Sequence, residues 1–171
     1  MLQRTKIKAL LAAEAPLGEV LVKGWVRTRR DAKDFSFIEL NDGSSLKNIQ
    51  VIANNNLNNY EDVKKLSTGS SVAVTGDMVA SQGGSQKFEI VAKDILIYDI
   101  ADDDYPLQKK KHTDEYLRTI AHLRPRTNKY GAAFRIRSEL AFAIHKIFHD
   151  RGFRYVHTPL ITGSDCEGAG E

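Results

Sequence analysis

Val20-Leu21-Val22-Lys23-Gly24-Trp25-Val26 alternates side chains in the way that predicts a half-buried β-strand. Val22, Gly24 and Val26 share one face, and Lys23 and Trp25 share the other. Similar patterns recur in four later runs, at residues 35–40, 48–53, 71–80 and 87–98. Asp42-Gly43 and Gly83-Gly84 stand where hairpin turns are expected. The region from residue 19 to 99 is therefore predicted to contain five strands.

A short helix is expected between the third and fourth strands, at residues 60–66. Five strands with a helix in this place match the order of an OB-fold, a small Greek-key barrel that binds oligonucleotides and oligosaccharides. A small β-sandwich is the alternative all-β arrangement. The helix after the third strand argues against the sandwich, so an all-β five-stranded OB-fold barrel is predicted.

The chain is predicted to contain four regions, of which the barrel is the second. Residues 1–18 are expected to hold an N-terminal helix that Thr5 caps and that ends at the sequence Pro16-Leu17-Gly18. The barrel occupies residues 19–100. Residues 101–129 form a charged hinge, in which an acidic run precedes Lys109-Lys110-Lys111. Residues 130–171 begin a second domain with a long helix followed by a strand.

Composition limits the classes of function. The chain has 171 residues, of which 42% are hydrophobic and 27% charged, as in an ordinary globular protein. Its formal net charge is only +3, so affinity for a nucleic acid has to come from a local patch. The single cysteine, Cys166, excludes an internal disulfide and a Cys-rich zinc module. With no apolar leader and no run long enough to cross a bilayer, a cytoplasmic protein without membrane contact is expected.

The outer face of the predicted barrel carries side chains that suit unpaired nucleotides. On the second strand Phe35, Phe37 and Glu39 are expected to point outward, and on the third strand Gln50 does the same. Aromatic faces stack on bases, amides read base edges, and cations neutralise phosphate. Arg29, Arg30 and Lys33 are placed in the loop after the first strand. The alternative for Phe35 and Trp25 is packing beneath the N-terminal helix or the hinge.

The long helix near residues 131–151 is apolar over most of its circumference. Such a helix needs burial on more than one side, so the chain is expected to dimerise or to expose an adhesive surface. His145 and His149 have metal-ligand spacing, but no third ligand is evident and no metal site is predicted. No phosphate-binding loop or dinucleotide fingerprint is present.

Several short motifs together carry a resemblance to a known family. They are Gly24-Trp25-Val26, Arg29-Arg30-Asp31, Phe37-Ile38 and Gln50-Val51, in that order, followed by the helix, the segment 150–160 and the small-residue loop 164–171. This arrangement resembles the class II aminoacyl-tRNA synthetases of the aspartyl/asparaginyl subgroup, as far as their motif 1. The sequence of this loop has Cys166 where aspartyl enzymes commonly have proline, and in this it resembles the asparaginyl branch.

The resemblance implies roles for residues of the barrel. Phe37 would stack on the central anticodon base, a uridine, while Gln50 hydrogen-bonds it and Arg30 contacts the anticodon loop. Glu89 is a candidate for an outer anticodon base, and its alternative is an exposed strand carboxylate. The remaining members of the expected tRNA surface are Trp25, Arg29 and Phe35. Lys109-Lys110-Lys111 are expected either to meet tRNA phosphate or to be a solvated run.

The resemblance also implies a ligase that acts in protein biosynthesis and uses ATP and Mg²⁺ to attach asparagine to its tRNA. Glu167 would belong to a loop that closes over the amino-acid pocket. The motif 1 helix would lie at a homodimer interface formed by Ile136, Leu140, Ile144, Ile147 and Pro159. Motifs 2 and 3 have no place before Glu171, so the 171-residue chain is expected to bind tRNA without catalysing the reaction. The alternatives are an aspartyl-type enzyme, including a non-discriminating one, and a stand-alone OB protein that binds single-stranded nucleic acid.

Overall fold

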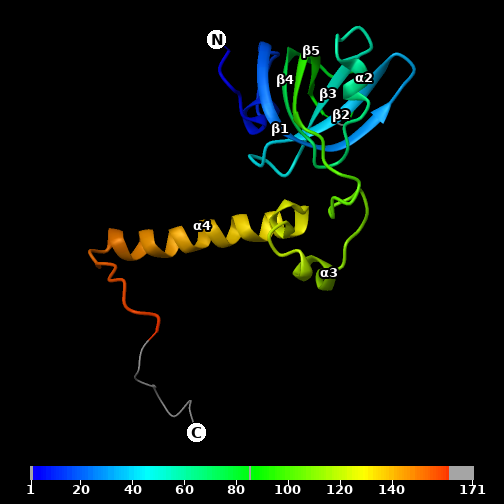
Figure 1. The fold of residues 1–171 in the computed structure, drawn as a ribbon. Coiled ribbons are helices and arrows are strands. Elements are labelled where there is room, and N and C mark those ends of the chain that lie inside the picture. Colours follow the sequence, from blue (N-terminus) through cyan, green and yellow to red (C-terminus); the bar gives the residue numbers. More distant parts are fainter. Residues whose placement is uncertain (1, 85, 162–171) are drawn as a thin grey trace. The chain divides into compact units, whose positions relative to one another are not determined.

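The computed structural model describes residues 2–84 and 86–161. The chain divides into two compact units, Met1–Gly131 and Ala132–Glu171. In the first unit five strands form a closed barrel in the order β1-β2-β3-β5-β4 (Figure 1). The strands are β1 (Gly18–Asp31), β2 (Phe35–Asn41), β3 (Ile49–Asn54), β4 (Ser71–Ala80) and β5 (Phe88–Asp99). With α2 (Tyr60–Val63) between β3 and β4, this is the predicted OB-fold.

The barrel closes through one parallel contact, in which β3 pairs with β5 at Val51 and Ile90. The other strand pairs of the barrel are antiparallel. Inward side chains of β1, β2 and β3 are completely buried, as the alternation in the sequence predicts. They include Val22, Val26, Ile38, Leu40, Ile49 and Val51.

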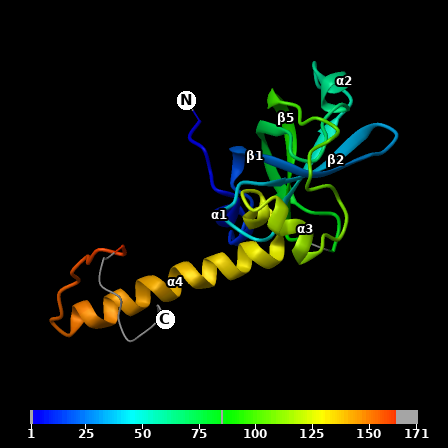
Figure 2. The same ribbon diagram turned by 60° about the horizontal axis from the view of Figure 1, so that its bottom comes forward.

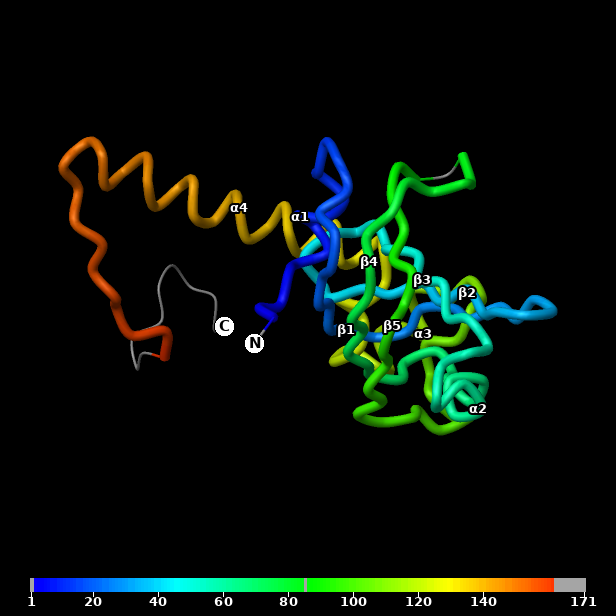
Figure 3. The backbone as a smooth tube through the Cα atoms, turned by 90° about the horizontal axis from the view of Figure 1, so that it is seen from above, coloured from blue at the N-terminus to red at the C-terminus, as the bar shows by residue number. Residues whose placement is uncertain are grey.

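Strand β1 is longer than predicted, and this corrects the placement of two arginines. The sequence pattern ended the strand at Val26 and put Arg29 and Arg30 in a loop, but both lie in β1. The pairing with β2 shifts between Val26 and Thr28, which makes Arg27 the extra residue of a β-bulge. The β1–β2 hairpin, drawn in light blue, projects from the rest of the barrel (Figures 2 and 3).

The first helix, α1 (Ile7–Leu11), is shorter than expected, and Thr5 does not cap it. The Asp42 carboxylate accepts the Ile7 N–H at 3.0 Å, and the Ser44 hydroxyl oxygen accepts the Lys8 N–H at 2.9 Å. Burial tends to raise the pKa of Asp42, but the hydrogen bonds from Ser44 and Ile7 outweigh it and hold that pKa below its usual value. The turn after β2 therefore anchors this helix in place of a local cap.

The predicted hinge contains α3 (Asp114–Thr119) and the 3₁₀ turn η1 (Arg124–Arg126). The Thr113 hydroxyl accepts the Tyr116 N–H and caps α3. The Lys129 ammonium pairs with the Asp114 carboxylate, which holds the pKa of Asp114 below its usual value. The connector is thus folded over part of its length.

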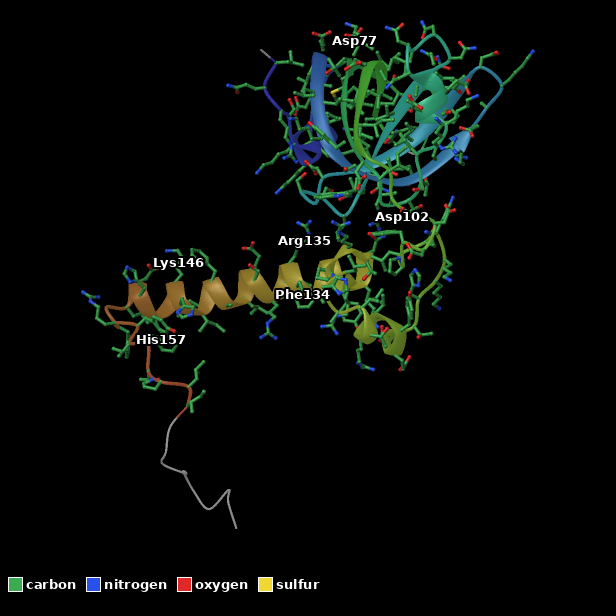
Figure 4. All side chains as sticks on the ribbon, viewed as in Figure 1. Asp77, Asp102, Phe134, Arg135, Lys146 and His157 are labelled. Atoms are coloured by element: carbon green, nitrogen blue, oxygen red, sulfur yellow. The ribbon has the colours of Figure 1, made fainter. Side chains whose placement is uncertain are left out.

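The second unit contains most of α4 (Asn128–Asp150), whose side chains project on every visible side (Figure 4). The strand predicted after this helix is not present, because residues 153–161 form neither helix nor strand. A β-strand requires hydrogen bonds to a neighbouring strand, and the described residues of this unit offer none. Within the described ranges, none of the helices is both long enough and apolar enough for a bilayer crossing.

Candidate nucleic-acid interface

An aromatic platform lies on the outer face of β2. Phe37 pairs with Arg30 of β1 on one side and with Ile52 of β3 on the other. The Phe35 ring stands perpendicular to the Phe37 ring, with 4.9 Å between their centroids. The Arg30 guanidinium carbon lies 5.5 Å from the Phe37 ring centroid, and its side chain is exposed. The structure therefore gathers three predicted residues, Phe35, Phe37 and Arg30, with Ile52 as a neighbour that the sequence analysis missed.

Arg29 does not join this platform, although it is the neighbour of Arg30 in sequence. It pairs with Ile38, whose side chain points into the barrel, so Arg29 lies on the opposite face of β1 from Arg30. Its Nε donates to the Leu66 carbonyl at 2.9 Å, and its Nη1 donates to the Asp31 carboxylate. The Ser36 hydroxyl and then Arg29 hold the pKa of Asp31 below its usual value. Arg29 thus fastens the turn after α2 to the end of the barrel.

Gln50 lies on the same outer face as Phe37. Glu39 is its direct partner across β2 and β3, so Phe37 and Gln50 are diagonal neighbours. The Gln50 Nε2 donates to Glu89 Oε2 at 2.9 Å, and the Ser81 hydroxyl donates to the same oxygen at 2.9 Å. Glu89 is only 4% exposed, so the reading of this residue as an exposed strand carboxylate is wrong. Glu89 lies beside Gln50 on the adjoining strand β5 and holds its amide, and its contact with an outer anticodon base stays a prediction.

A groove of about 660 Å³ opens beside Gln50. Its polar lining comes from β2, from β3 and the turn before it, and from the β4–β5 hairpin, and includes Glu39, Lys47, Asn48, Gln50, Gln86 and Lys87. Asn48 Nδ2 donates to Glu39 Oε2 at 2.9 Å, and the Gln86 side-chain oxygen accepts the Gln50 backbone N–H at 3.4 Å. Gln86 was missed because no strand periodicity links the hairpin to β3.

Trp25 is set apart from the Phe37 platform. It pairs with Asn41, near the other end of β2, and is 42% exposed. The Arg126 guanidinium carbon lies 4.7 Å from its ring centroid, and the Arg126 carbonyl accepts a hydrogen bond from Arg27 Nη1 at 2.9 Å. The connector therefore covers part of the Trp25 ring, in line with the alternative that the sequence left open.

A second groove, of about 600 Å³, lies between the barrel and the connector of the first unit. Cationic side chains dominate its charged lining, and these are Arg27, Lys109, Lys110, Lys111, Arg126 and Lys129. Glu39 and Asp114 line it as well, and Asp114 pairs with Lys129. This groove has the charge required to hold phosphate groups.

The chain is similar to known proteins that bind nucleic acids and attach amino acids to tRNA. Residues 20–98 match a family model described as an OB-fold nucleic acid binding domain. Over 171 residues the chain is 58% identical to the asparagine–tRNA ligase of Nitratidesulfovibrio vulgaris (strain DP4), an alignment that covers 99% of the chain. By sequence, the chain is similar along nearly its whole length to asparagine–tRNA ligases. It spans 37% of the length of that relative.

Further relatives and solved structures show the same similarity. The asparagine–tRNA ligase of Clostridium botulinum (strain Eklund 17B / Type B) is 58% identical over 153 residues, which cover 90% of this chain and 33% of that protein. The asparaginyl-tRNA synthetase of Pyrococcus horikoshii complexed with asparaginyl-adenylate matches with a TM-score of 0.85 at 22% identity, covering 99% of this chain and 39% of that one. An Entamoeba histolytica aspartyl-tRNA synthetase matches with a TM-score of 0.73 at 21% identity, over 92% of this chain and 39% of that one. These two structures show a shared fold.

The remaining predicted residues of the chain lie in or after α4. Ile136, Leu140, Ile144 and Ile147 follow one another at helical spacing on one side of α4, and each is 50–62% exposed. Pro159 is also exposed, and Glu167 lies outside the described residues. The His145 ring contacts the Tyr155 ring edge-on at 4.8 Å between centroids. In the part of the chain that the structure describes, no three His, Cys, Asp or Glu side chains come together as metal ligands do.

Proposed function

We propose that this chain supplies the anticodon-binding part of an asparagine–tRNA ligase. The observation that carries the proposal is the juxtaposition of Phe37, Arg30 and the Gln50 amide on the outer face of an OB-fold barrel. The 58% identity to asparagine–tRNA ligases supports asparagine rather than aspartate as the amino acid of the complete enzyme.

Each of the three side chains has a distinct part in the proposed recognition. The Phe37 ring stacks on the central anticodon base, a contact worth about 1–3 kcal/mol per base. The Gln50 amide hydrogen-bonds the edge of that base, a uridine. Arg30 lies where it neutralises the adjoining phosphate, since its guanidinium group is exposed beside the Phe37 ring.

The basic groove extends the proposed interface beyond the anticodon. Lys109, Lys110 and Lys111 lie in it together with Arg27 of the bulge. We propose that phosphates of the tRNA body bind there, which makes this contact insensitive to base sequence and sensitive to salt.

The complete enzyme is proposed to attach asparagine to its tRNA at the expense of ATP and with Mg²⁺. The described residues bring together no group of three carboxylate or imidazole side chains, so no magnesium site is assigned to them. Glu167 is proposed for the amino-acid pocket. The exposed apolar side of α4, with Pro159, is proposed as a homodimer interface.

Salt-controlled binding to two anticodon stem-loops, one with the asparagine anticodon and one with the aspartate anticodon, tests the anticodon role. The 171-residue chain is expected to prefer the asparagine stem-loop, and Phe37→Ala is expected to weaken that binding about 5-fold or more. Leu96→Ala is a matched control, because Leu96 is a 54% exposed apolar side chain of β5 that pairs with Ala73 of β4, outside the part of β5 that pairs with β3.

The outcomes separate the candidate functions. Equal binding of both stem-loops, still dependent on Phe37, would favour a non-discriminating aspartyl-type enzyme. Equal binding that does not depend on Phe37 would reduce the domain to a general binder of single strands and overturn the proposal.

A further inference from the structure

The Gln50 amide is held by Glu89 of the neighbouring strand β5, and Glu89 is in turn held by Ser81 of the β4–β5 hairpin. Glu89 on β5 accepts the Gln50 Nε2 at 2.9 Å, and the Ser81 hydroxyl donates to the same Glu89 oxygen. We infer that Ser81 and Glu89 are a positioning pair that fixes the orientation of the Gln50 amide and so lets Gln50 distinguish uridine from cytidine. This inference rests on the proposed function.

The chemistry of the pair permits one orientation of the amide. A carboxylate has acceptors only, so Glu89 takes an N–H from Gln50 and repels its carbonyl oxygen. The Gln50 Oε1 is therefore turned away from Glu89. One N–H of the amide remains for a second acceptor, next to that oxygen.

Ser81 is itself placed by the closure of the β4–β5 hairpin. Its backbone N–H donates to the Lys87 carbonyl at 2.9 Å, and its hydroxyl oxygen accepts the Gly83 N–H at 3.2 Å. Its hydroxyl hydrogen is then directed at Glu89, which is nearly fully buried. The hairpin thus sets the position of the carboxylate, and the carboxylate sets the amide.

A fixed amide discriminates where a rotating one does not. Uridine presents an N–H at position 3 beside a carbonyl oxygen, whereas cytidine presents a bare nitrogen beside an amino group. With the base held on Phe37, an amide that offers oxygen to position 3 accepts from uridine and faces an unpaired acceptor in cytidine. An amide free to turn by half a rotation satisfies either base, so the discrimination depends on the support from Ser81 and Glu89.

The test compares two asparagine stem-loops that differ only in uridine or cytidine at the central anticodon position. For the wild-type chain the ratio of dissociation constants is expected to favour uridine by about tenfold or more. Ser81→Ala and Glu89→Gln are each expected to reduce this ratio to about threefold or less. Glu89→Gln lets the amide turn, because a glutamine side chain can donate as well as accept, and Ser81→Ala releases the Glu89 carboxylate that holds the amide in place. Gln82→Ala is the control within the same hairpin, since Gln82 is the residue next to Ser81 and its side chain is exposed.

A structural role alone has a different signature. In that case both variants lower the melting temperature and weaken binding to both stem-loops by the same factor, so the ratio of dissociation constants stays unchanged. This result overturns the inference. It leaves the proposed function in place, provided that the wild-type chain prefers uridine and that Phe37→Ala still weakens binding. If the wild-type chain binds both stem-loops equally, the inference is overturned as well. The proposed anticodon role then fails separately only if Phe37→Ala also has no effect.

Discussion

Replacing Arg30 or Arg29 by glutamine removes one positive charge in each case, from adjacent positions. We nevertheless expect Arg30→Gln to weaken RNA binding and Arg29→Gln to lower the stability of the fold. Arg30 is exposed beside the Phe37 ring. One lost phosphate contact lowers the slope of log affinity against log salt by about 0.7 for a single strand. The same lost contact should raise the dissociation constant by about two- to fivefold at low salt.

Arg29→Gln acts on stability instead. The Arg29 side chain is 21% exposed and bonds the Leu66 carbonyl and the Asp31 carboxylate. A hydrogen bond from a charged donor is worth about 1.5–3 kcal/mol, and the ion pair adds little because Asp31 is 45% exposed. Glutamine replaces part of the bond, so a loss of about 1–2 kcal/mol in the free energy of unfolding is expected.

Two measurements on both variants decide the matter. Urea unfolding of Arg29→Gln should show a midpoint lower by about 0.5–1 M, with the Arg30→Gln midpoint near that of the wild type. Stem-loop affinity measured from low to moderate salt should show the reduced slope for Arg30→Gln only. A reduced slope of equal size in both variants, with unchanged stability of Arg29→Gln, would refute the placement of the two arginines on opposite faces of β1.

Further predictions concern the barrel and α4. Gly76→Ala puts a Cβ 2.2 Å from the Val91 carbonyl oxygen and should cost about 1–3 kcal/mol in chemical unfolding, whereas Gly84→Ala meets nothing within 4 Å and should be neutral. The pKa of Asp42 is lower in the folded chain than in the unfolded chain. Ionised Asp42 therefore stabilises the fold above pH 3.8, its ordinary pKa, and this stabilisation is lost as the pH falls through the folded-state pKa. Unfolding measured as a function of pH should show a shallower loss of stability in acid for Asp42→Asn than for the wild type. Leu140→Glu should convert a dimeric or self-associating chain to a monomer in sedimentation, and a monomeric wild-type chain that binds no apolar dye would contradict the proposed interface.

Much of the barrel follows from local pattern. Strand β4 covers the residues that the alternation predicts, and β2, β3 and β5 begin or end within one residue of their predicted bounds. Phe37 and Gln50 were placed on the outer face because each is adjacent in sequence to an inward aliphatic residue. The short helices were predicted less well, since Asp42, distant in sequence, supplies the N-terminal hydrogen bond of α1.

The contacts of Glu89 and Ser81 that hold Gln50 could not be predicted from such patterns. Glu89 contacts Gln50 because β3 and β5 run side by side, although 39 residues separate the two positions. In sequence Glu89 is only a carboxylate in a strand, and Ser81 is only a turn residue. Pairing of distant strands, which buries Glu89 and aims the serine hydroxyl at it, has no local signature.

The amino-acid sequence was enough to establish the OB-fold, the aromatic and amide side chains on its outer face, and the resemblance to the asparaginyl family. Which arginine lies beside Phe37 was decided by the bulge at Arg27. Without that extra residue, strict alternation from Trp25 would bring Arg29 to the outer face. The bulge arises where β1 leaves β4, as the Val26 N–H donates to the Ser70 carbonyl at 2.8 Å and β1 continues along β2 alone. Hydrogen bonds to residues more than forty positions away, which no local period of two reveals, therefore turned Arg30 toward the proposed RNA-binding face and Arg29 toward the barrel.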